Sequence, residues 1–228
     1  MEIAGIAPNS TVDYPGVLCA VLFTSGCNMN CFFCHNRALI GRDSALTSID
    51  WLWDFLKKRR KSLDGVVISG GEPTMQKDLV AFIKDTKSLG YKVKLDTNGS
   101  NPHVLETLLH MNLLDYVAID YKAPWKQYPA VCRYLDVGAL LATFEILKSA
   151  KISWEARTTM LPHLTKEEYL EMAESVFILP RYVLNQYRIP VDFAESDRFK
   201  IQLKPFTKEK LATLKDAIKA VQPNTTLA

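Results

Sequence analysis

The sequence lacks a hydrophobic run of membrane-spanning length, because no stretch reaches the roughly 18 consecutive apolar residues that a transmembrane helix requires. Its N-terminus has neither the basic nor the apolar segment of a secretory signal peptide. We therefore expect no membrane contact and a cytoplasmic location, where thiols stay reduced.

The chain also has little net charge and few cysteines. Its 28 basic and 25 acidic residues give a formal net charge of +3, too small to indicate nucleic-acid binding. The basic run at 57–61 closes an amphipathic segment, so we interpret it as a solvated helix end that complements the helix dipole. The five cysteines are odd in number, and three of them crowd into a short segment where neighbours are poorly placed to pair. A metal site explains them better than disulfides do.

Apolar runs of strand length alternate with longer amphipathic segments, which indicates one α/β domain over residues 1–228. We expect strands at 17–24, 65–69, 92–97, 116–122, 154–161 and 182–189. We expect helices at 48–60, 77–89, 102–111, 137–150, 166–177 and 207–221, and an irregular segment at 191–205. Six strand–helix units are fewer than a closed TIM barrel needs, so the pattern predicts a partial (β/α)6 TIM-like barrel, open on one side. A flat doubly wound sheet is the alternative.

Three cysteines, Cys27, Cys31 and Cys34, stand in a C-x3-C-x2-C pattern. A short loop with this spacing can wrap three thiolates around one face of an iron–sulfur cubane and leave the fourth iron open. The alternative is a zinc ion bound by the three cysteines and His35. Because His35 directly follows Cys34, and adjacent residues rarely both reach one metal, we favour the cluster. The other two cysteines, at positions 19 and 132, are interpreted as ordinary small apolar residues.

A glycine-rich segment follows the second predicted strand. Gly70 and Gly71 would let the backbone approach a ligand closely, and Glu72 could accept hydrogen bonds from an ammonium group. The same GGEP sequence is also compatible with a tight turn that binds nothing.

Charged residues end or interrupt the next strands, where ligands bind in parallel α/β proteins. Asp96 and Asp120 end adjacent predicted strands, and two nearby carboxylates would need a cation between them or a shared proton. Lys122 could supply part of that charge, and a structural ion pair is the alternative. Arg157 lies inside the fifth predicted strand and needs a partner for its charge.

In this order, the motifs resemble the radical S-adenosylmethionine superfamily, and more closely its activases of glycyl radical enzymes. The closer resemblance rests on TVDYPG at 11–16, CHN at 34–36, GVVISGGEPT, VKLDTNGSNP and AIDYKAP. These segments look like those of the anaerobic ribonucleoside-triphosphate reductase activating proteins. The resemblance implies a [4Fe-4S] cluster on Cys27, Cys31 and Cys34 that reductively cleaves S-adenosylmethionine. The 5′-deoxyadenosyl radical would then take a hydrogen atom from a glycine of a partner, most closely anaerobic ribonucleotide reductase. An electron donor such as flavodoxin or ferredoxin is implied as well.

The resemblance also implies cofactor-binding residues, which all lie in the cysteine loop or at strand ends: Phe33, His35, Gly70, Gly71, Glu72, Asp96, Asp120, Lys122 and Arg157. The residues from Phe33 to His35 would border the adenine, while Gly71 and Glu72 would hold the methionine amine.

The remaining implied contacts come from the later strands. Asp120 and Lys122 would contact the ribose or the carboxylate end of the cofactor, and Arg157 would meet the methionine carboxylate or the partner peptide. Asp96 and Asp120 resemble a pair that holds a monovalent cation with nearby backbone carbonyls.

The sequence departs from the activases in three places. Position 14 is tyrosine where many activases have glycine, and the sixth strand has Gln-Tyr-Arg at 186–188 where the pyruvate formate-lyase activator has a histidine. A second cysteine-rich insert, which would hold auxiliary clusters, is missing. Two rival hypotheses remain. One is a radical enzyme that acts on a small molecule or on another glycyl radical enzyme. The other is a non-catalytic iron–sulfur or zinc module, which leaves the GGEP and DTNG strand ends unexplained.

Overall fold

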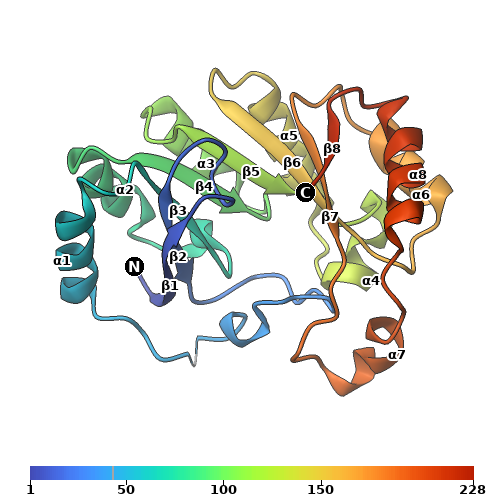
Figure 1. The fold of residues 1–228 in the computed structure, drawn as a ribbon, viewed down its shortest axis with the longest axis horizontal. Coiled ribbons are helices and arrows are strands. Elements are labelled where there is room, and N and C mark those ends of the chain that lie inside the picture. Colours follow the sequence, from blue (N-terminus) through green and yellow to red (C-terminus); the bar gives the residue numbers. More distant parts are fainter. Residues whose placement is uncertain (43) are drawn as a thin grey trace. The chain divides into compact units, whose positions relative to one another are not determined.

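The computed structural model describes residues 1–42 and 44–228. Eight strands form one sheet, and their order across the sheet follows their order in the chain, from β1 to β8 (Figure 1). A doubly wound sheet reverses its strand order at a switch point. Since this sheet has no reversal, that alternative is wrong. In the described residues β1 and β8 remain two separate edges, so the sheet is open, as predicted for a partial barrel.

All six predicted strands are confirmed, and they are β2 (Cys19–Thr24), β3 (Gly65–Gly70), β4 (Lys92–Thr97), β5 (Tyr116–Asp120), β6 (Ser153–Met160) and β7 (Tyr182–Gln186). Two further strands were not predicted. β1 (Ile3–Ser10) pairs antiparallel with β2, and β8 (Thr225–Leu227) pairs parallel with β7. The sequence obscures β1 because it contains Gly5 and Pro8, residue types that are depleted in strands. β8 is too short to show a period.

All six predicted helices are confirmed as well, and they are α1 (Ile49–Arg59), α2 (Leu79–Ser88), α3 (Pro102–His110), α5 (Val137–Lys148), α6 (Lys166–Glu174) and α8 (Lys208–Lys219). Side-chain oxygens of Ser48, Thr165 and Thr207 cap three of them by accepting backbone N–H groups. None of the described helices is both long enough and apolar enough to cross a bilayer.

Short helices that were not predicted fill several connections: η1 (Arg37–Leu39), η2 (Pro73–Met75), η3 (Trp125–Gln127), α4 (Tyr128–Cys132), η4 (Glu195–Asp197) and α7 (Arg198–Ile201). The last two lie in the segment predicted to be irregular. Single helical turns bury too few residues to show a periodic apolar pattern.

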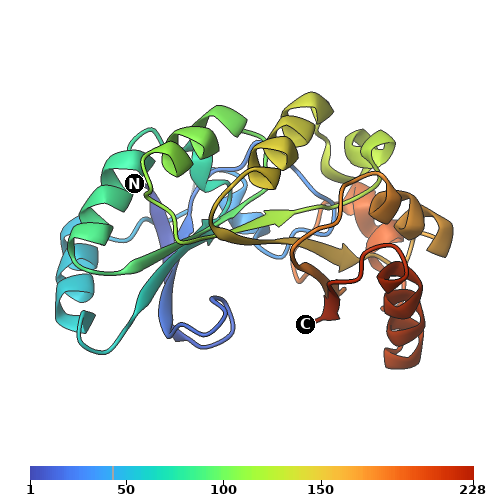
Figure 2. The same ribbon diagram turned by 90° about the horizontal axis from the view of Figure 1, so that it is seen from above.

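The chain divides into two compact units. The first unit contains residues 1–28, 38–118 and 138–153. In this unit β2, β3 and β4 run parallel, and Thr24 at the end of β2 pairs with Gly70 at the end of β3. Helices follow the strands along one side of this sheet (Figure 2). Its buried core includes Tyr14, Val17, Cys19, Val21, Val67 and Tyr116. Cys19 is therefore a core residue, as predicted.

The second unit contains residues 29–37, 119–137 and 154–228. Strands β6, β7 and β8 run parallel in it, and α6 packs beside α8 (Figure 1). The Thr158 hydroxyl donates to the Tyr121 carbonyl at 2.6 Å and lies 2.9 Å from the Tyr182 hydroxyl, which satisfies these buried polar groups. Because side chains alternate along a strand, Arg157 must face the opposite side of β6 from Thr158.

Candidate active site

The GGEP turn lies against the residue that precedes the first cysteine of the motif. Gly71 N–H donates to Thr24 O at 2.9 Å, and Glu72 N–H donates to Gly26 O at 2.8 Å. A Cβ atom on Gly71 would lie 2.1 Å from Gly26 O, and one on Gly70 would lie 2.3 Å from Thr24 N. Gly70 also has a φ of 108°, which side chains disfavour. Both glycines are therefore required by close backbone approach.

The Glu72 carboxylate is fully buried and ties the turn to the end of β4. Its Oε1 accepts from Thr74 N at 3.1 Å, from the Thr74 hydroxyl at 2.6 Å and from the Thr97 hydroxyl at 2.7 Å. Its Oε2 accepts from Asn98 N at 2.7 Å. Burial raises the pKa of Glu72, while these hydrogen bonds oppose the rise. The Glu72 side chain thus joins the GGEP turn to the end of β4. Because Oε1 already accepts three hydrogen bonds, only Oε2 can accept from another donor.

Asn98 is a site residue that sequence reasoning did not single out. Its Nδ2 lies 3.9 Å from Cys27 Sγ and donates to Asn28 Oδ1 at 2.9 Å. Its Oδ1 accepts from Ser100 N at 2.9 Å, which fixes the orientation of the amide. The signal was present in the DTNG strand end, where an amide side chain follows the polar residues that were assigned.

Asp96 is paired with Lys94 of its own strand. Lys94 Nζ lies 2.5 Å from Asp96 Oδ1, and the two side chains are 1% and 9% exposed. Lys94 also lies 5.8 Å from the centre of the Tyr116 ring. The predicted strand at 92–97 included Lys94, but its charge was not considered. The structure therefore places a cationic group on the carboxylate for which a bound cation was predicted.

In the second unit, hydrogen bonds hold the cysteine loop against α4. Asn30 N–H donates to Cys132 O at 2.9 Å, and Phe32 N–H donates to Val131 O at 3.2 Å. Arg133 donates to Asn30 O at 2.9 Å and forms a two-pronged ion pair with Asp197, both contacts at 2.8 Å. The backbone of the loop is therefore anchored to α4 and to the residue that follows it.

The aromatic residues of this loop differ in exposure. Phe33 is buried and packs edge-on against Phe32 at 5.4 Å, while Phe32 packs against the His163 ring at 5.0 Å. His35 is exposed. The structure gives neither Phe33 nor His35 a ligand, so their contact with the adenine stays a prediction.

Cys132 is buried, as expected of a small apolar residue, but its thiol is hydrogen-bonded to the thiol of Cys31. This hydrogen bond lowers the pKa of Cys31, whereas burial raises the pKa of Cys132. The contact could not be predicted from the sequence, because the two cysteines belong to distant segments.

Asp120, Lys122 and Arg157 form one charged cluster at the end of β5 and within β6. Lys122 Nζ lies 2.8 Å from Asp120 Oδ2, and Arg157 Nη2 lies 3.2 Å from Asp120 Oδ1. Burial raises the pKa of Asp120, but the two cations outweigh burial and bring that pKa down to about 2. The partner that Arg157 was expected to need is Asp120. The two cations contact different oxygens of the Asp120 carboxylate.

The polar residues at the end of β7 make hydrogen bonds within the second unit. Gln186 Nε2 donates to Phe206 O at 3.3 Å, and the Tyr187 hydroxyl donates to Ile201 O at 3.2 Å. These two residues hold the segment that follows β7, which gives them a structural reason to be polar.

The donor chemistry of the cysteine motif fits an iron–sulfur cluster. All five cysteines lie in the described part of the chain, and none is in a disulfide. Among residues 1–42 and 44–228, no three His, Cys, Asp or Glu side chains group closely enough to hold a metal ion. Cys27 belongs to the first unit, and Cys31 and Cys34 belong to the second. The fit to an iron–sulfur cluster therefore rests on the chemistry and sequence spacing of the three thiols. The anchored loop and the amide donor beside Cys27 Sγ add to it.

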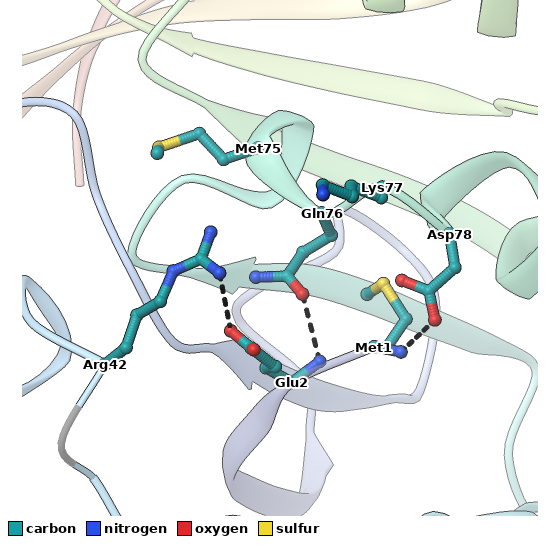
Figure 3. Close-up of a pocket in the computed structure, with 7 residues that line it drawn as sticks. All are labelled: Met1, Glu2, Arg42, Met75, Gln76, Lys77 and Asp78. Carbon is teal, nitrogen blue, oxygen red and sulfur yellow. Dashed lines mark hydrogen bonds and ion pairs between the residues drawn. The ribbon is translucent and has the colours of Figure 1, made fainter.

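A cavity of about 310 Å³ lies elsewhere in the first unit (Figure 3). Its polar groups bond to one another, because Arg42 pairs with Glu2 at 3.5 Å and Glu2 N–H donates to Gln76 Oε1 at 2.9 Å. The Met1 amine pairs with Asp78. None of the predicted site residues lines this cavity, and we assign it no role.

Comparisons with known proteins identify the family. The model of the Radical SAM superfamily matches residues 21–176. A relative from Methanocaldococcus jannaschii, named as a glycyl-radical enzyme activating enzyme, is 36% identical over 208 residues, which cover 87% of this chain and 84% of the relative. A relative from Saccharolobus solfataricus, named as a GTP 3′,8-cyclase, is 36% identical over 91 residues, which cover 40% of this chain and 29% of the relative.

A solved structure has the same fold. SuiB of Streptococcus suis superimposes with a TM-score of 0.68 at 14% identity, over 91% of this chain and 48% of SuiB. Enzymes of the superfamily use a [4Fe-4S] cluster and S-adenosylmethionine, and these are the cofactors of this protein. The chain belongs to the radical SAM superfamily and, within it, to the glycyl-radical enzyme activating enzymes.

Proposed function

We propose that this enzyme generates a glycyl radical on anaerobic ribonucleoside-triphosphate reductase. The activase function is carried by one observation, the similarity to the M. jannaschii activating enzyme along most of both chains. The choice of the reductase is supported by the segments at 11–16 and 34–36 and by the GVVISGGEPT, VKLDTNGSNP and AIDYKAP stretches. A cytoplasmic location and a flavodoxin or ferredoxin as electron donor belong to the same proposal.

In this proposal Cys27, Cys31 and Cys34 hold the cluster. The reduced cluster supplies the electron that cleaves S-adenosylmethionine. The Asn98 amide donates toward Cys27 Sγ, and a donor beside a ligating sulfur stabilises negative charge there. The backbone bonds from Asn30 and Phe32 to α4 hold the loop in place while iron is bound.

Contacts within each unit support the residues proposed to hold the cofactor. In the first unit, Gly71 is proposed to meet the methionine amine through its backbone, and Glu72 fixes that turn. In the second unit, Lys122 and Arg157 share the carboxylate of Asp120 and are 16% and 20% exposed. Both side chains are cationic, which suits the methionine carboxylate, and a guanidinium binds a carboxylate through two parallel hydrogen bonds.

The proposed reaction consumes one electron and one S-adenosylmethionine. A carbon–sulfur bond of the cofactor breaks, and a Cα–H bond of one glycine in the partner breaks. The products are methionine, 5′-deoxyadenosine and the partner with an unpaired electron on that glycine. The protein contributes alignment, which is the main advantage that it can add to a reactive species.

The test is electron paramagnetic resonance on the anaerobically reconstituted enzyme with dithionite, S-adenosylmethionine and the candidate reductase. We expect a doublet from a glycyl radical, which disappears when the partner's glycine is changed to alanine. Cys31→Ala should abolish the signal, while the matched control Cys19→Ala, in the core of the first unit, should keep it.

The second candidate function is radical chemistry on a small molecule, which the partial similarity to a GTP 3′,8-cyclase favours. If no reductase gives the doublet while a nucleotide or another small molecule is consumed, this candidate replaces the activase.

A further inference from the structure

Two thiols of the second unit are in contact although they are far apart in the sequence. Cys31 and Cys132 are hydrogen-bonded through their sulfur atoms. Their backbones are held side by side by Asn30 N–H to Cys132 O at 2.9 Å and by Phe32 N–H to Val131 O at 3.2 Å. The backbone bonds therefore keep the two cysteine-bearing segments next to each other.

The residue after Cys132 locks this arrangement. Arg133 has a left-handed φ of 51° and donates to Asn30 O at 2.9 Å, so the end of α4 and the cysteine loop are clamped together. The two sulfur atoms already lie within hydrogen-bonding reach of each other, and a disulfide needs the same close approach of the two side chains. The pair can therefore be bridged with little backbone movement.

The other thiol near Cys31 has a different relationship to it. Cys34 N–H donates to Cys31 O at 3.2 Å across a turn, while burial and the charge of Cys31 raise the pKa of Cys34. Cys132 is the thiol that Cys31 touches. It is fully buried, whereas Cys31 is 7% exposed, so an oxidant from solvent meets Cys31 first.

We propose that Cys31 and Cys132 form a reversible disulfide whenever Cys31 is not bound to the cluster. The oxidant is a small-molecule disulfide. The Cys31 thiolate attacks one of its sulfurs and expels one thiol, leaving a mixed disulfide on Cys31. The Cys132 thiolate then attacks the Cys31 sulfur and expels the second thiol. Two protein thiols lose two electrons and two protons, and the small disulfide is reduced to two thiols.

The disulfide gives Cys132 a function that the cluster-bound enzyme does not use. It holds an unligated Cys31 in a form that a thiol reductant restores, and it blocks irreversible oxidation to sulfinic acid. Iron can then enter only after the disulfide is reduced. This consequence rests on the proposed role of Cys31 as a cluster ligand, whereas the disulfide itself does not.

The test uses the full-length, iron-free protein treated with glutathione disulfide and digested with trypsin without reduction. Cleavage after lysine and arginine leaves the other four cysteines in one peptide, residues 1–37, and Cys132 alone in residues 127–133. We expect mass spectrometry to show these two peptides joined and to show them separate after reduction. A protein that forms only a disulfide inside residues 1–37 would overturn the proposal.

Variants identify the partner of Cys132. Cys31→Ser should lose the joined peptides, and Cys34→Ser should keep them. A joined species that survives in Cys31→Ser would also overturn the proposal. Cys132→Ser and Cys132→Ala are used together, since serine buries a hydroxyl and alanine leaves a small void, and both should lose the species.

Iron binding separates this proposal from the proposed function. Reduced Cys132→Ala should bind as much iron as the wild type, because Cys132 is not a ligand. Loss of iron in that variant would contradict the reversible-disulfide role. Failure to produce a glycyl radical, by contrast, would leave the peptide result intact and would count against the activase alone.

Discussion

Glu72 offers the sharpest test of how the GGEP turn works. Its buried carboxylate accepts four hydrogen bonds, of which three reach Oε1 and one reaches Oε2. In Glu72→Gln one of these oxygens becomes an NH2 group. If the glutamine oxygen takes the place of Oε1, which accepts three hydrogen bonds, the NH2 group takes the place of Oε2. Two donors, this NH2 group and Asn98 N–H, then face each other where a 2.7 Å hydrogen bond stood.

The expected cost follows from the bonds that are broken. Glu72→Gln leaves one buried backbone donor unsatisfied, which costs about 1–3 kcal/mol of the free energy of unfolding. Glu72→Ala leaves the N–H groups of Thr74 and Asn98 unsatisfied while the threonine hydroxyls rotate to new partners, so it costs about 2–6 kcal/mol. In a chain of this length, each kcal/mol lowers Tm by roughly 2–4 °C.

Thermal and urea unfolding of the reduced, iron-free protein measure these costs without any cofactor. Glu168→Gln is the matched control. Glu168 Oε2 accepts from Thr165 N at 2.7 Å in a capping box, a position where glutamine serves as well as glutamate. Its Oε1 accepts from the Gln127 side-chain amide, which can turn over so that its oxygen faces the new NH2 group. The reasoning is refuted if both Glu72 variants unfold like the wild type yet lose S-adenosylmethionine binding. That result would mean that Glu72 acts on the methionine amine directly.

Three further predictions follow from the charged and glycine-rich parts of the site. Gly71→Ala should lower Tm and abolish 5′-deoxyadenosine production measured by liquid chromatography, because the alanine Cβ would lie 2.1 Å from Gly26 O. A variant that produces 5′-deoxyadenosine at the wild-type rate would contradict this prediction. Asp120→Asn should cost about 1–2 kcal/mol in urea unfolding at pH 7. Since the pKa of Asp120 is lowered from 3.8 to about 2, this stabilisation is present above pH 4 and should shrink as pH falls toward 2; a difference that stays constant with pH would refute it. Cleavage of S-adenosylmethionine should not depend on K⁺ or Na⁺, because the Lys94 ammonium already neutralises Asp96. Lys94→Met should make cleavage depend on one of these ions. A wild-type enzyme that needs K⁺ or Na⁺ would show that the Lys94 ammonium does not replace the bound cation.

Much of the fold was predictable because each element from β2 to β7 carries a strong local signal. Strands such as Gly65–Gly70 are buried runs of β-branched residues, and helices such as Lys166–Glu174 begin at a capping box. β1 was missed because it is an antiparallel edge strand with turn-forming residues, and pairing, rather than propensity, makes it a strand.

The candidate site was predictable to the extent that its chemistry is local in the sequence. Cys27, Glu72 and Asp120 stand in short motifs at strand ends, where ligands bind in this class of fold. Asn98 and Cys132 were missed because their roles come from partners on other segments, Cys27 and Cys31. Lys94 was missed because a buried lysine is rare and is tolerated only beside a carboxylate such as Asp96.

The order of the strands has a consequence for how the protein is made. Because every strand from β2 onward pairs with the strand that precedes it in the chain, each can join the sheet as soon as it leaves the ribosome. The cysteine loop is synthesised early, between β2 and β3, but its partners Gly71, Asn98 and Cys132 emerge much later. During synthesis the loop is therefore an unsupported segment with three thiols. We therefore expect the three proposed ligands to bind iron only after the chain has passed α4.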